Sequence, residues 1–170
     1  MIPMDPLNRE VLKAELRIDE GEKLRVYKCT EGFDTIGCGR NLDAVGLSLA
    51  EQLALGCTVA EVKKKGITKA QSDLLLDNDI DRSMAGLDRY LPWWRTLDPV
   101  RQRVLVNMCF NMGIGNGRNG LTSFRNTLRY IKEGNYSHAA DNMLASKWAR
   151  QVGNRAKRLA ELMRLGPRQL

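Results

Sequence analysis

The longest uninterrupted helical pattern in the chain begins at Thr68 and limits the folds that the chain can adopt. Thr68 and Gln71 form a capping box, in which each side chain satisfies a backbone amide of the first helical turn. Apolar residues then recur at helical spacing as far as Tyr90, namely Leu76, Ile80, Met84 and Leu87. Pro92 follows and ends the pattern. A helix of roughly 20 residues spans about 30 Å, so in a chain of this length it could join two lobes.

Helices are predicted over most of the remaining chain. One runs from Val11 and stops near Gly21, a second opens at the capping box of Ser48 and Glu51, and a third extends from the Asp98-Pro99 start to Gly113. Three more are expected at about 123–133, 137–146 and 154–165. By contrast, residues 24–36 alternate with the period of two of short strands around a turn at residues 29–32. The sequence therefore predicts an α+β fold, mostly α, with a small N-terminal β-sheet.

Composition limits the size and the partners of the protein. A chain of 170 residues that is 43% hydrophobic can bury the core of one domain. Its formal charge of +7 favours anionic partners, which include nucleic acid, membrane surfaces and acidic cell-wall polymers. The charge alone does not choose among them.

Two further absences in the sequence bear on location and metal chemistry. No apolar run approaches the roughly 20 residues that span a bilayer, and the opening MIPMDPLNRE lacks the apolar segment of a signal peptide, so we expect a protein kept in the cytoplasm. The four cysteines, which are Cys29, Cys38, Cys57 and Cys109, are scattered, and His138 is the single histidine. This pattern predicts free thiols and no metal site.

Two short motifs favour structural interpretations over binding sites. The GCG sequence at residues 37–39 lacks the following Lys and Ser or Thr of a phosphate-binding loop. The basic runs at residues 63–65 and 155–158 have few interleaved aromatic residues, so we interpret them as solvated faces and expect no nucleic-acid partner.

Four segments, in this order, carry a resemblance to a known family. They are LRIDEGEKLRVYKCTEGFDTIGCGR, ITKAQSDLLLDND, NMCFNMG and NRAKR, and they resemble the T-even phage lysozyme family, glycoside hydrolase family 24, from about residue 11 to 163. The resemblance implies a lysozyme-like two-lobe fold, with an N-terminal lobe at about 10–67, a connecting helix at about 68–90 and a helical C-terminal lobe at about 91–166. It also implies a muramidase that cleaves the β-1,4 bond between N-acetylmuramic acid and N-acetylglucosamine in bacterial peptidoglycan.

The family pattern of catalytic residues falls on Glu20, Cys29 and Thr35. Members of the family place a glutamate, an aspartate nine residues later and a threonine six residues further on, so this chain keeps the spacing but has cysteine for the aspartate. Glu20 would be the general acid, which must carry a proton when the glycosidic oxygen leaves. The aspartate, with the threonine, would activate water or stabilise charge on the other face of the sugar.

Cysteine changes the mechanism that this position can support. A thiol with a pKa of about 8.5 is largely neutral at pH 7, whereas an aspartate at about 3.9 is ionised. If its surroundings lower that pKa, Cys29 becomes a nucleophile that could form a covalent intermediate. Three interpretations stay open: a naturally adapted cysteine, a hydrolase that depends on Glu20 and Thr35, or an engineered substitution.

Other positions follow from the same resemblance. Four residues match family positions that line the saccharide cleft, namely Asn41, Phe110, Thr127 and Asn142. Arg155 matches an arginine near the catalytic glutamate, although an ordinary helix-start ion pair explains it nearly as well. Arg40 and Asp79 are interpreted as a structural ion pair.

The resemblance also implies partners and a location. The partner is bacterial peptidoglycan, the protein is expected to be a monomer without a cofactor, and it would wait in the host cytoplasm until a holin-type pore former releases it to the periplasmic cell wall. Two alternatives are a lytic transglycosylase, which needs Glu20 but no activated water, and a peptidoglycan-binding protein with impaired turnover.

Overall fold

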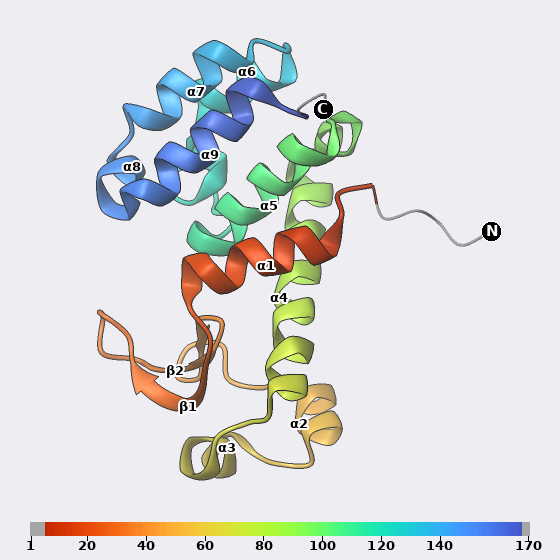
Figure 1. Ribbon diagram of the computed structural model, residues 1–170, viewed down its shortest axis with the longest axis vertical. Helices are drawn as coiled ribbons and strands as arrows, with labels where there is room; N and C mark the ends of the chain where they lie inside the picture. Colours follow the sequence, from red (N-terminus) through yellow and green to blue (C-terminus); the bar gives the residue numbers. More distant parts are fainter. Residues whose placement is uncertain (1–5, 168–170) are drawn as a thin grey trace, which may run out of the picture. The chain divides into compact units, whose positions relative to one another are not determined.

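The computed structural model describes residues 6–167, and the fold class predicted from the sequence is confirmed (Figure 1). Residues 1–5, which entered the argument against a signal peptide, lie outside the described residues. In chain order the elements are α1 (Arg9–Glu20), β1 (Lys23–Lys28), β2 (Asp34–Gly37), β3 (Arg40–Asn41), α2 (Leu49–Leu55), α3 (Val59–Lys65), α4 (Lys69–Tyr90), the 3-10 helix η1 (Pro92–Thr96), α5 (Pro99–Met112), the 3-10 helix η2 (Leu121–Ser123), α6 (Arg125–Lys132), α7 (Tyr136–Leu144), α8 (Lys147–Val152) and α9 (Asn154–Leu165).

The chain forms two compact units. One consists of residues 13–79, and the other combines the residues up to Leu12 with those from Ile80 onward. Helices α1 and α4 both contribute residues to each unit. The predicted long helix is present, because α4 has 22 residues and Thr68 caps it as expected: the Thr68 amide donates to Gln71 Oε1 at 2.8 Å, and the Gln71 amide donates to Thr68 Oγ1 at 3.1 Å.

The unit of residues 13–79 contains the predicted hairpin, extended by a third strand. Strands β1, β2 and β3 form an antiparallel sheet in that order, with Lys23 opposite Gly37 and Thr35 opposite Asn41. Apolar side chains from the sheet, α2, α3 and α4 pack into one core cluster, consisting of Ile36, Leu42, Leu47, Leu55, Cys57, Val62, Ile67 and Leu75. This cluster fixes the sheet against the start of α4.

Helix α3 was not predicted from the sequence. Its N-terminus carries a capping box, in which the Glu61 amide donates to Thr58 Oγ1 at 3.3 Å and the Thr58 amide donates to Glu61 Oε1 at 3.2 Å. The predicted box of Ser48 and Glu51 is present at α2. The Thr58 signal is of the same kind as the one that predicted α2, and both helices have seven residues, so the capping box was the signal that could have found α3.

The regular elements in the described residues of the second unit are all helices. Asp98 caps α5 as predicted, accepting from the Arg101 amide at 3.0 Å, and Pro99 occupies the first turn. Helix α7 packs against α6 and α9, and α9 also packs against α5 and α8 (Figure 1). Between α5 and η2 the chain doubles back so tightly that a Cβ at Gly115 would lie 1.8 Å from the Asn119 carbonyl oxygen. Only glycine fits there.

One helix in this unit differs from the prediction. Ser146 was expected to be the last residue of the helix that begins near residue 137, but α7 ends at Leu144 and Ser146 instead caps α8. Its hydroxyl accepts from the Ala149 amide at 3.1 Å. A serine serves a helix start better than a helix end, because its oxygen can satisfy an amide that has no intrahelical partner.

Among residues 6–167, no helix is both long and apolar enough to cross a membrane.

Candidate functional site

Glu20 is the last residue of α1, where the helix gives way to Gly21 at a φ of 73°. The segment Gly37-Cys38-Gly39, here called the 37–39 turn, lies against it. Both of its glycines have positive φ values, of 65° and 83°, and a Cβ at Gly39 would lie 3.6 Å from the Glu20 carboxyl carbon. The GCG motif therefore brings backbone against the carboxylate.

Cys29 begins the turn between β1 and β2. The Gly32 amide donates to the Cys29 carbonyl at 2.8 Å, and the Cys29 amide donates to the Phe33 carbonyl at 3.0 Å. A hydrogen bond from the Phe33 backbone to the sulfur is the main cause that lowers the pKa of the Cys29 thiol, with further hydrogen bonds from the Glu31 backbone and the Thr35 hydroxyl. The turn thus supplies donors that favour a thiolate.

Thr35 lies at the centre of a row across the sheet. It is paired with Tyr27 on β1 and with Asn41 on β3, and directly opposed residues project from the same face of a sheet. The Thr35 hydroxyl donates to the Phe33 carbonyl at 3.0 Å. Because a threonine hydroxyl has one hydrogen, it can donate either to this carbonyl or to the Cys29 thiolate.

Tyr27 is a member of the site that the sequence analysis missed. Burial raises the pKa of its phenol, and the negative charges of Glu20, Cys29 and Cys38 raise it further. Tyr27 therefore lies within electrostatic range of both Glu20 and Cys29. Lys23 Nζ stands 4.5 Å from the ring centroid. The available signal was its position near the end of β1, two residues before Cys29.

Asn41 is the last residue of β3, and its side chain stabilises the turn that follows. Its side-chain oxygen accepts from the amides of Asp43 and Ala44 at 2.9 and 2.8 Å, which is the geometry of a turn stabilised by asparagine. The unit of residues 13–79 therefore contains Glu20, Cys29, Thr35 and Asn41, with Tyr27 beside them.

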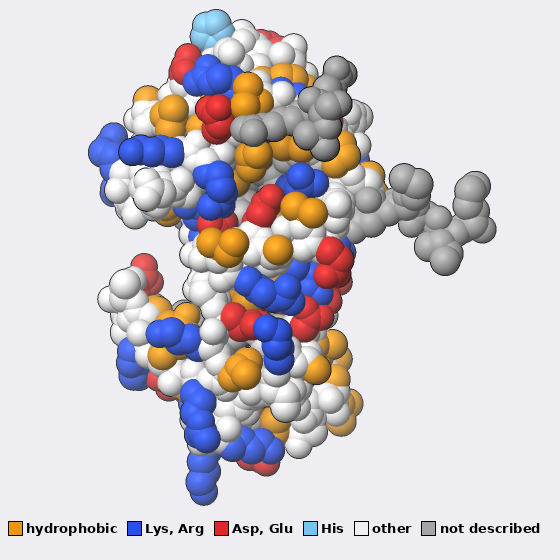
Figure 2. All heavy atoms as spheres, viewed as in Figure 1, with side chains coloured by type: hydrophobic (Ala, Val, Ile, Leu, Met, Phe, Trp, Pro, Cys, Tyr) orange, Lys and Arg blue, Asp and Glu red, His pale blue; other side chains and the backbone are white. Residues whose placement is uncertain are grey.

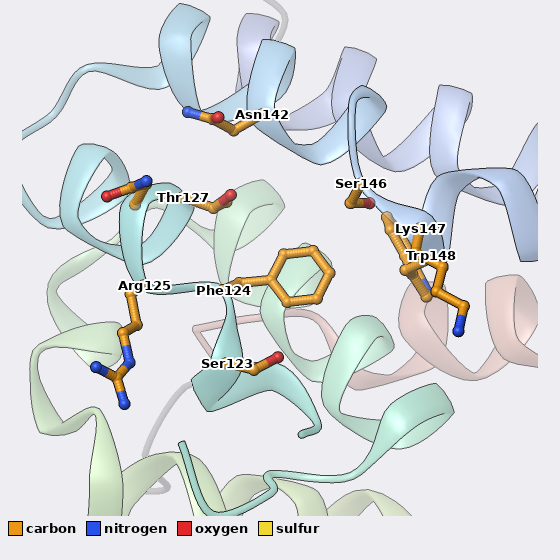
Figure 3. Close-up of a pocket in the computed structure, with 9 residues that line it drawn as sticks. Ser123, Phe124, Arg125, Thr127, Asn142, Ser146, Lys147 and Trp148 are labelled. Atoms are coloured by element: carbon orange, nitrogen blue, oxygen red, sulfur yellow. The ribbon is translucent and has the colours of Figure 1, made fainter. Parts of the chain in front are cut away.

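The other unit contains a pocket of about 570 Å³ (Figure 3). Its lining consists of Ser123, Phe124, Arg125, Asn126, Thr127, Asn142, Ser146, Lys147 and Trp148. Two predicted saccharide contacts, Thr127 and Asn142, are thus neighbours here, whereas Phe110 does not belong to this lining. The pocket lies between the start of α6, α7 and the start of α8.

The centre of this pocket is aromatic and polar but uncharged. In Figure 3 the Phe124 ring points into it, and the charged ends of Arg125 and Lys147 point away from it. Phe124 meets Trp148 edge to face at 6.0 Å between ring centroids, and the Trp148 indole donates to Asn111 Oδ1 at 2.7 Å. A rigid aromatic wall beside hydroxyl and amide groups suits a neutral polar ligand such as a sugar.

Arg155 is nearly buried near the start of α9, at 9% exposure. Its Nε donates to Asn107 Oδ1 at 2.9 Å, and Asn107 is fully buried on α5. Arg155 therefore links two helices of its own unit.

No group of three or more His, Cys, Asp or Glu side chains gathers in a way that could hold a metal ion within the part of the chain that the structure describes. His138 lies against the Tyr130 ring, with 5.3 Å between ring centroids, and its Nδ1 is 2.8 Å from Asn135 Oδ1. The side chain of His138 is thus engaged within its own helix and with α6.

The chain is similar to known proteins over most of its length. The family model described as phage lysozyme matches residues 17–164. The chain is 31% identical to probable T4-type lysozyme 1 of Dictyostelium discoideum over 91% of its own length and 94% of that protein, and probable T4-type lysozyme 2 of the same organism has the same identity and coverage. It is also 28% identical to the pre-baseplate central spike protein Gp5 of Enterobacteria phage T4, over 97% of this chain but 29% of that one.

Proposed function

Because the chain belongs to the phage lysozyme family and is a glycoside hydrolase of the lysozyme type, we propose that Glu20, Cys29 and Thr35 hydrolyse the β-1,4 bond between N-acetylmuramic acid and N-acetylglucosamine in peptidoglycan. The observation that carries this proposal is the arrangement of the two turns that flank β2, the strand of Thr35: Cys29 begins the turn before it, and the 37–39 turn after it lies against the Glu20 carboxyl group. Thr35 stands directly opposite Tyr27 in the sheet.

Each residue has a separate task in the proposed reaction. Glu20 donates its proton to the glycosidic oxygen as the bond from that oxygen to the anomeric carbon breaks. A water molecule attacks the anomeric carbon, and its proton passes to the Cys29 thiolate. The Thr35 hydroxyl, which can turn from the Phe33 carbonyl to the sulfur, supports the thiolate before the transfer. This sequence of steps inverts the anomeric centre.

The pocket of the other unit is proposed to hold a saccharide through Thr127 and Asn142, with Phe124 as an apolar wall. The residues from Gly113 onward hold a clear excess of Lys and Arg over Asp and Glu. Figure 2 shows such side chains gathered over α8, which carries Lys147 and Arg150. Peptidoglycan bears carboxylates on its peptide stems, so this charge favours long-range attraction to the wall.

The test is product analysis on purified peptidoglycan, with Glu20→Gln as the decisive variant. Hydrolysis releases reducing ends with the α anomer, and Glu20→Gln is expected to lower the rate about a hundredfold or more. Glu61→Gln, which removes a charge of the same kind at the α3 cap, serves as the matched control. Near-full activity of folded Glu20→Gln would refute the assignment. Products with 1,6-anhydro ends would identify a transglycosylase, and wall binding without soluble products would identify a binding protein.

We further propose a role in host lysis, in which the protein accumulates in the host cytoplasm as a monomer and depends on a holin-type pore former. Its expression alone should then leave bacterial cultures intact, and co-expression of a pore-forming membrane protein should clear them. Clearing without the pore former would refute this dependence.

A further inference from the structure

Glu22 is a partly buried acid that the proposed reaction does not use. It lies two residues after Glu20, between the end of α1 and the start of β1, and its side chain is 14% exposed. An acid in such a place is normally exposed or paired, because burying a charge without partners costs several kcal/mol. Its partners therefore indicate what it does.

The Glu22 carboxylate joins α1 to α4. The Ser72 hydroxyl donates to its Oε2 at 2.9 Å, Lys69 Nζ lies 3.4 Å from its Oε1, and Arg17 Nε lies 3.7 Å from its Oε2. Although burial opposes ionisation, the hydrogen bond from Ser72 and the charges of Lys69 and Arg17 lower the pKa of Glu22 below its usual value. The group is therefore a carboxylate at neutral pH.

The same carboxylate also binds the 37–39 turn. The Cys38 thiol donates to Glu22 Oε2 at 3.8 Å. Burial, and then the negative charge of Glu22, raise the pKa of Cys38 to about 11, so the thiol keeps the proton that it donates. Gly37 completes the attachment, since a Cβ there would lie 3.2 Å from Ser72 Oγ. Glu22 thus lies where α1, α4 and this turn meet.

The elements that Glu22 holds together contact or precede Glu20 on two sides. Arg17, one helical turn before Glu20, bonds both Glu22 and Asp73 of α4. Gly39, the last residue of the 37–39 turn, packs on the Glu20 side chain. A shift of the turn or of the end of α1 would therefore move the Glu20 carboxylate or change the space around it.

We propose that Glu22 is a positioning residue for the lysozyme reaction, which holds the 37–39 turn and the end of α1 so that the Glu20 carboxylate keeps one orientation. The inference rests on the proposed role of Glu20 as the general acid. Proton transfer demands a narrow geometry, and a displacement of about 1 Å can lower a rate by roughly a hundredfold.

The first variants to test are Glu22→Leu and Glu22→Gln. Leucine is similar in size but removes all the polar bonds, so kcat is expected to fall about tenfold or more, while KM stays within about twofold because no substrate contact is lost. Glutamine keeps an oxygen that can accept from Ser72 and Cys38, so it should restore a large part of kcat. Glu61→Gln, the matched control, should keep the parental kcat.

Two milder variants keep the proposal testable if Glu22→Leu does not fold. Ser72→Ala and Cys38→Ala each remove one bond to the carboxylate, and each is expected to lower kcat severalfold at a temperature well below its melting point. The double variant should lose no more than Glu22→Leu. A melting point that falls while kcat stays at the parental value in all of these variants would show a purely structural role and overturn the proposal.

The outcomes also separate this inference from the proposed function. If Glu20→Gln is inactive and the Glu22 and Ser72 variants keep full kcat, only the positioning role is wrong. If Glu20→Gln keeps full activity, the proposed function itself is wrong.

Discussion

Arg40 and Glu51 form a bidentate ion pair inside the unit of residues 13–79. Arg40 Nη1 and Nη2 donate to Glu51 Oε1 and Oε2 at 2.9 and 2.8 Å, and each residue is only 3% exposed. Asp79 accepts from the same guanidinium at 2.9 Å. The ion pair expected between Arg40 and Asp79 is therefore present, and the buried Arg40 guanidinium pairs with Glu51 as well. The pair anchors β3, since Arg40 is its first residue.

The first prediction is an acid-sensitive contribution to stability from this pair. Hydrogen bonds from Arg40 are the main cause that lowers the pKa of Glu51 to about 2. Because the pKa is lower in the folded protein than in the unfolded chain, where it is about 4.3, the contribution is complete above that value and is lost as the pH falls toward 2. Its size is about 3 kcal/mol. Urea unfolding between pH 6 and 2.5 measures it.

Glu51→Gln should remove this pH dependence and lower the free energy of unfolding by about 3 kcal/mol or more, because Arg40 loses its main buried partner. Glu133→Gln, at the exposed end of α6, is the control. It should lose free energy of unfolding between pH 6 and 2.5 to the same extent as the parent protein. The prediction would be contradicted if the free energy of unfolding of Glu51→Gln fell with pH as much as that of the parent protein.

The second prediction concerns the thiols. Cys29 is half-buried and its pKa is lowered, mainly by the hydrogen bond from the Phe33 backbone, whereas burial raises the pKa of both Cys38 and Cys109 to about 11. Iodoacetamide should therefore label Cys29 first, with a midpoint below the usual thiol pKa, and saccharide should slow the labelling. Peptide mass spectrometry locates the label. Labelling of Cys38 or Cys109 as fast as that of Cys29 would contradict this order. In a separate measurement, thiol titration of the denatured, unreduced protein should find four free thiols.

The third prediction tests the chemical role of Cys29. Cys29→Asp restores the family residue, which is ionised at neutral pH and can act as the base, so it should retain or raise activity. Cys29→Ala removes the base and should lower kcat about a hundredfold. Thermal melting confirms that both variants are folded. An alanine variant as active as the parent would mean that Glu20 and Thr35 suffice, and β-anomer product from the parent would indicate a covalent intermediate on sulfur.

The fourth prediction concerns the pocket of α6, α7 and α8. Asn142→Ala should raise KM for peptidoglycan severalfold with little change in kcat, because a contact shared by ground state and transition state is lost. Asn135→Ala is a useful control, since Asn135 caps α7 by accepting from the His138 amide and lies outside the pocket lining. It should lower stability by about 1 kcal/mol and leave KM unchanged. If Asn142→Ala keeps the parental KM, as Asn135→Ala should, the pocket takes no part in saccharide binding.

Local sequence signals determined the main elements of this protein. The Thr68 and Ser48 capping boxes, the Asp98-Pro99 start and the alternation of residues 24–36 predicted α4, α2, α5 and the hairpin, because each signal depends on residues within a few positions of one another. The ordered segments around Glu20 and NRAKR were enough to indicate the family. Helix α3 escaped prediction although Thr58 and Glu61 form a capping box like that of α2, whereas the six residues of α8 show too little periodicity.

The tertiary structure alone decided what the charged and aromatic residues of the site do. Glu22 joins α1 to α4 through a hydrogen bond with Ser72, fifty positions away in the chain. Glu51 forms a buried ion pair with Arg40, although its local sequence pattern indicated only a helix cap. Tyr27 lies beside the candidate catalytic residues because the register of β1 and β2 places it opposite Thr35. Helices and turns form from neighbours along the chain, whereas the ionisation and orientation of a side chain depend on burial and on partners that only the folded chain brings within hydrogen-bonding distance.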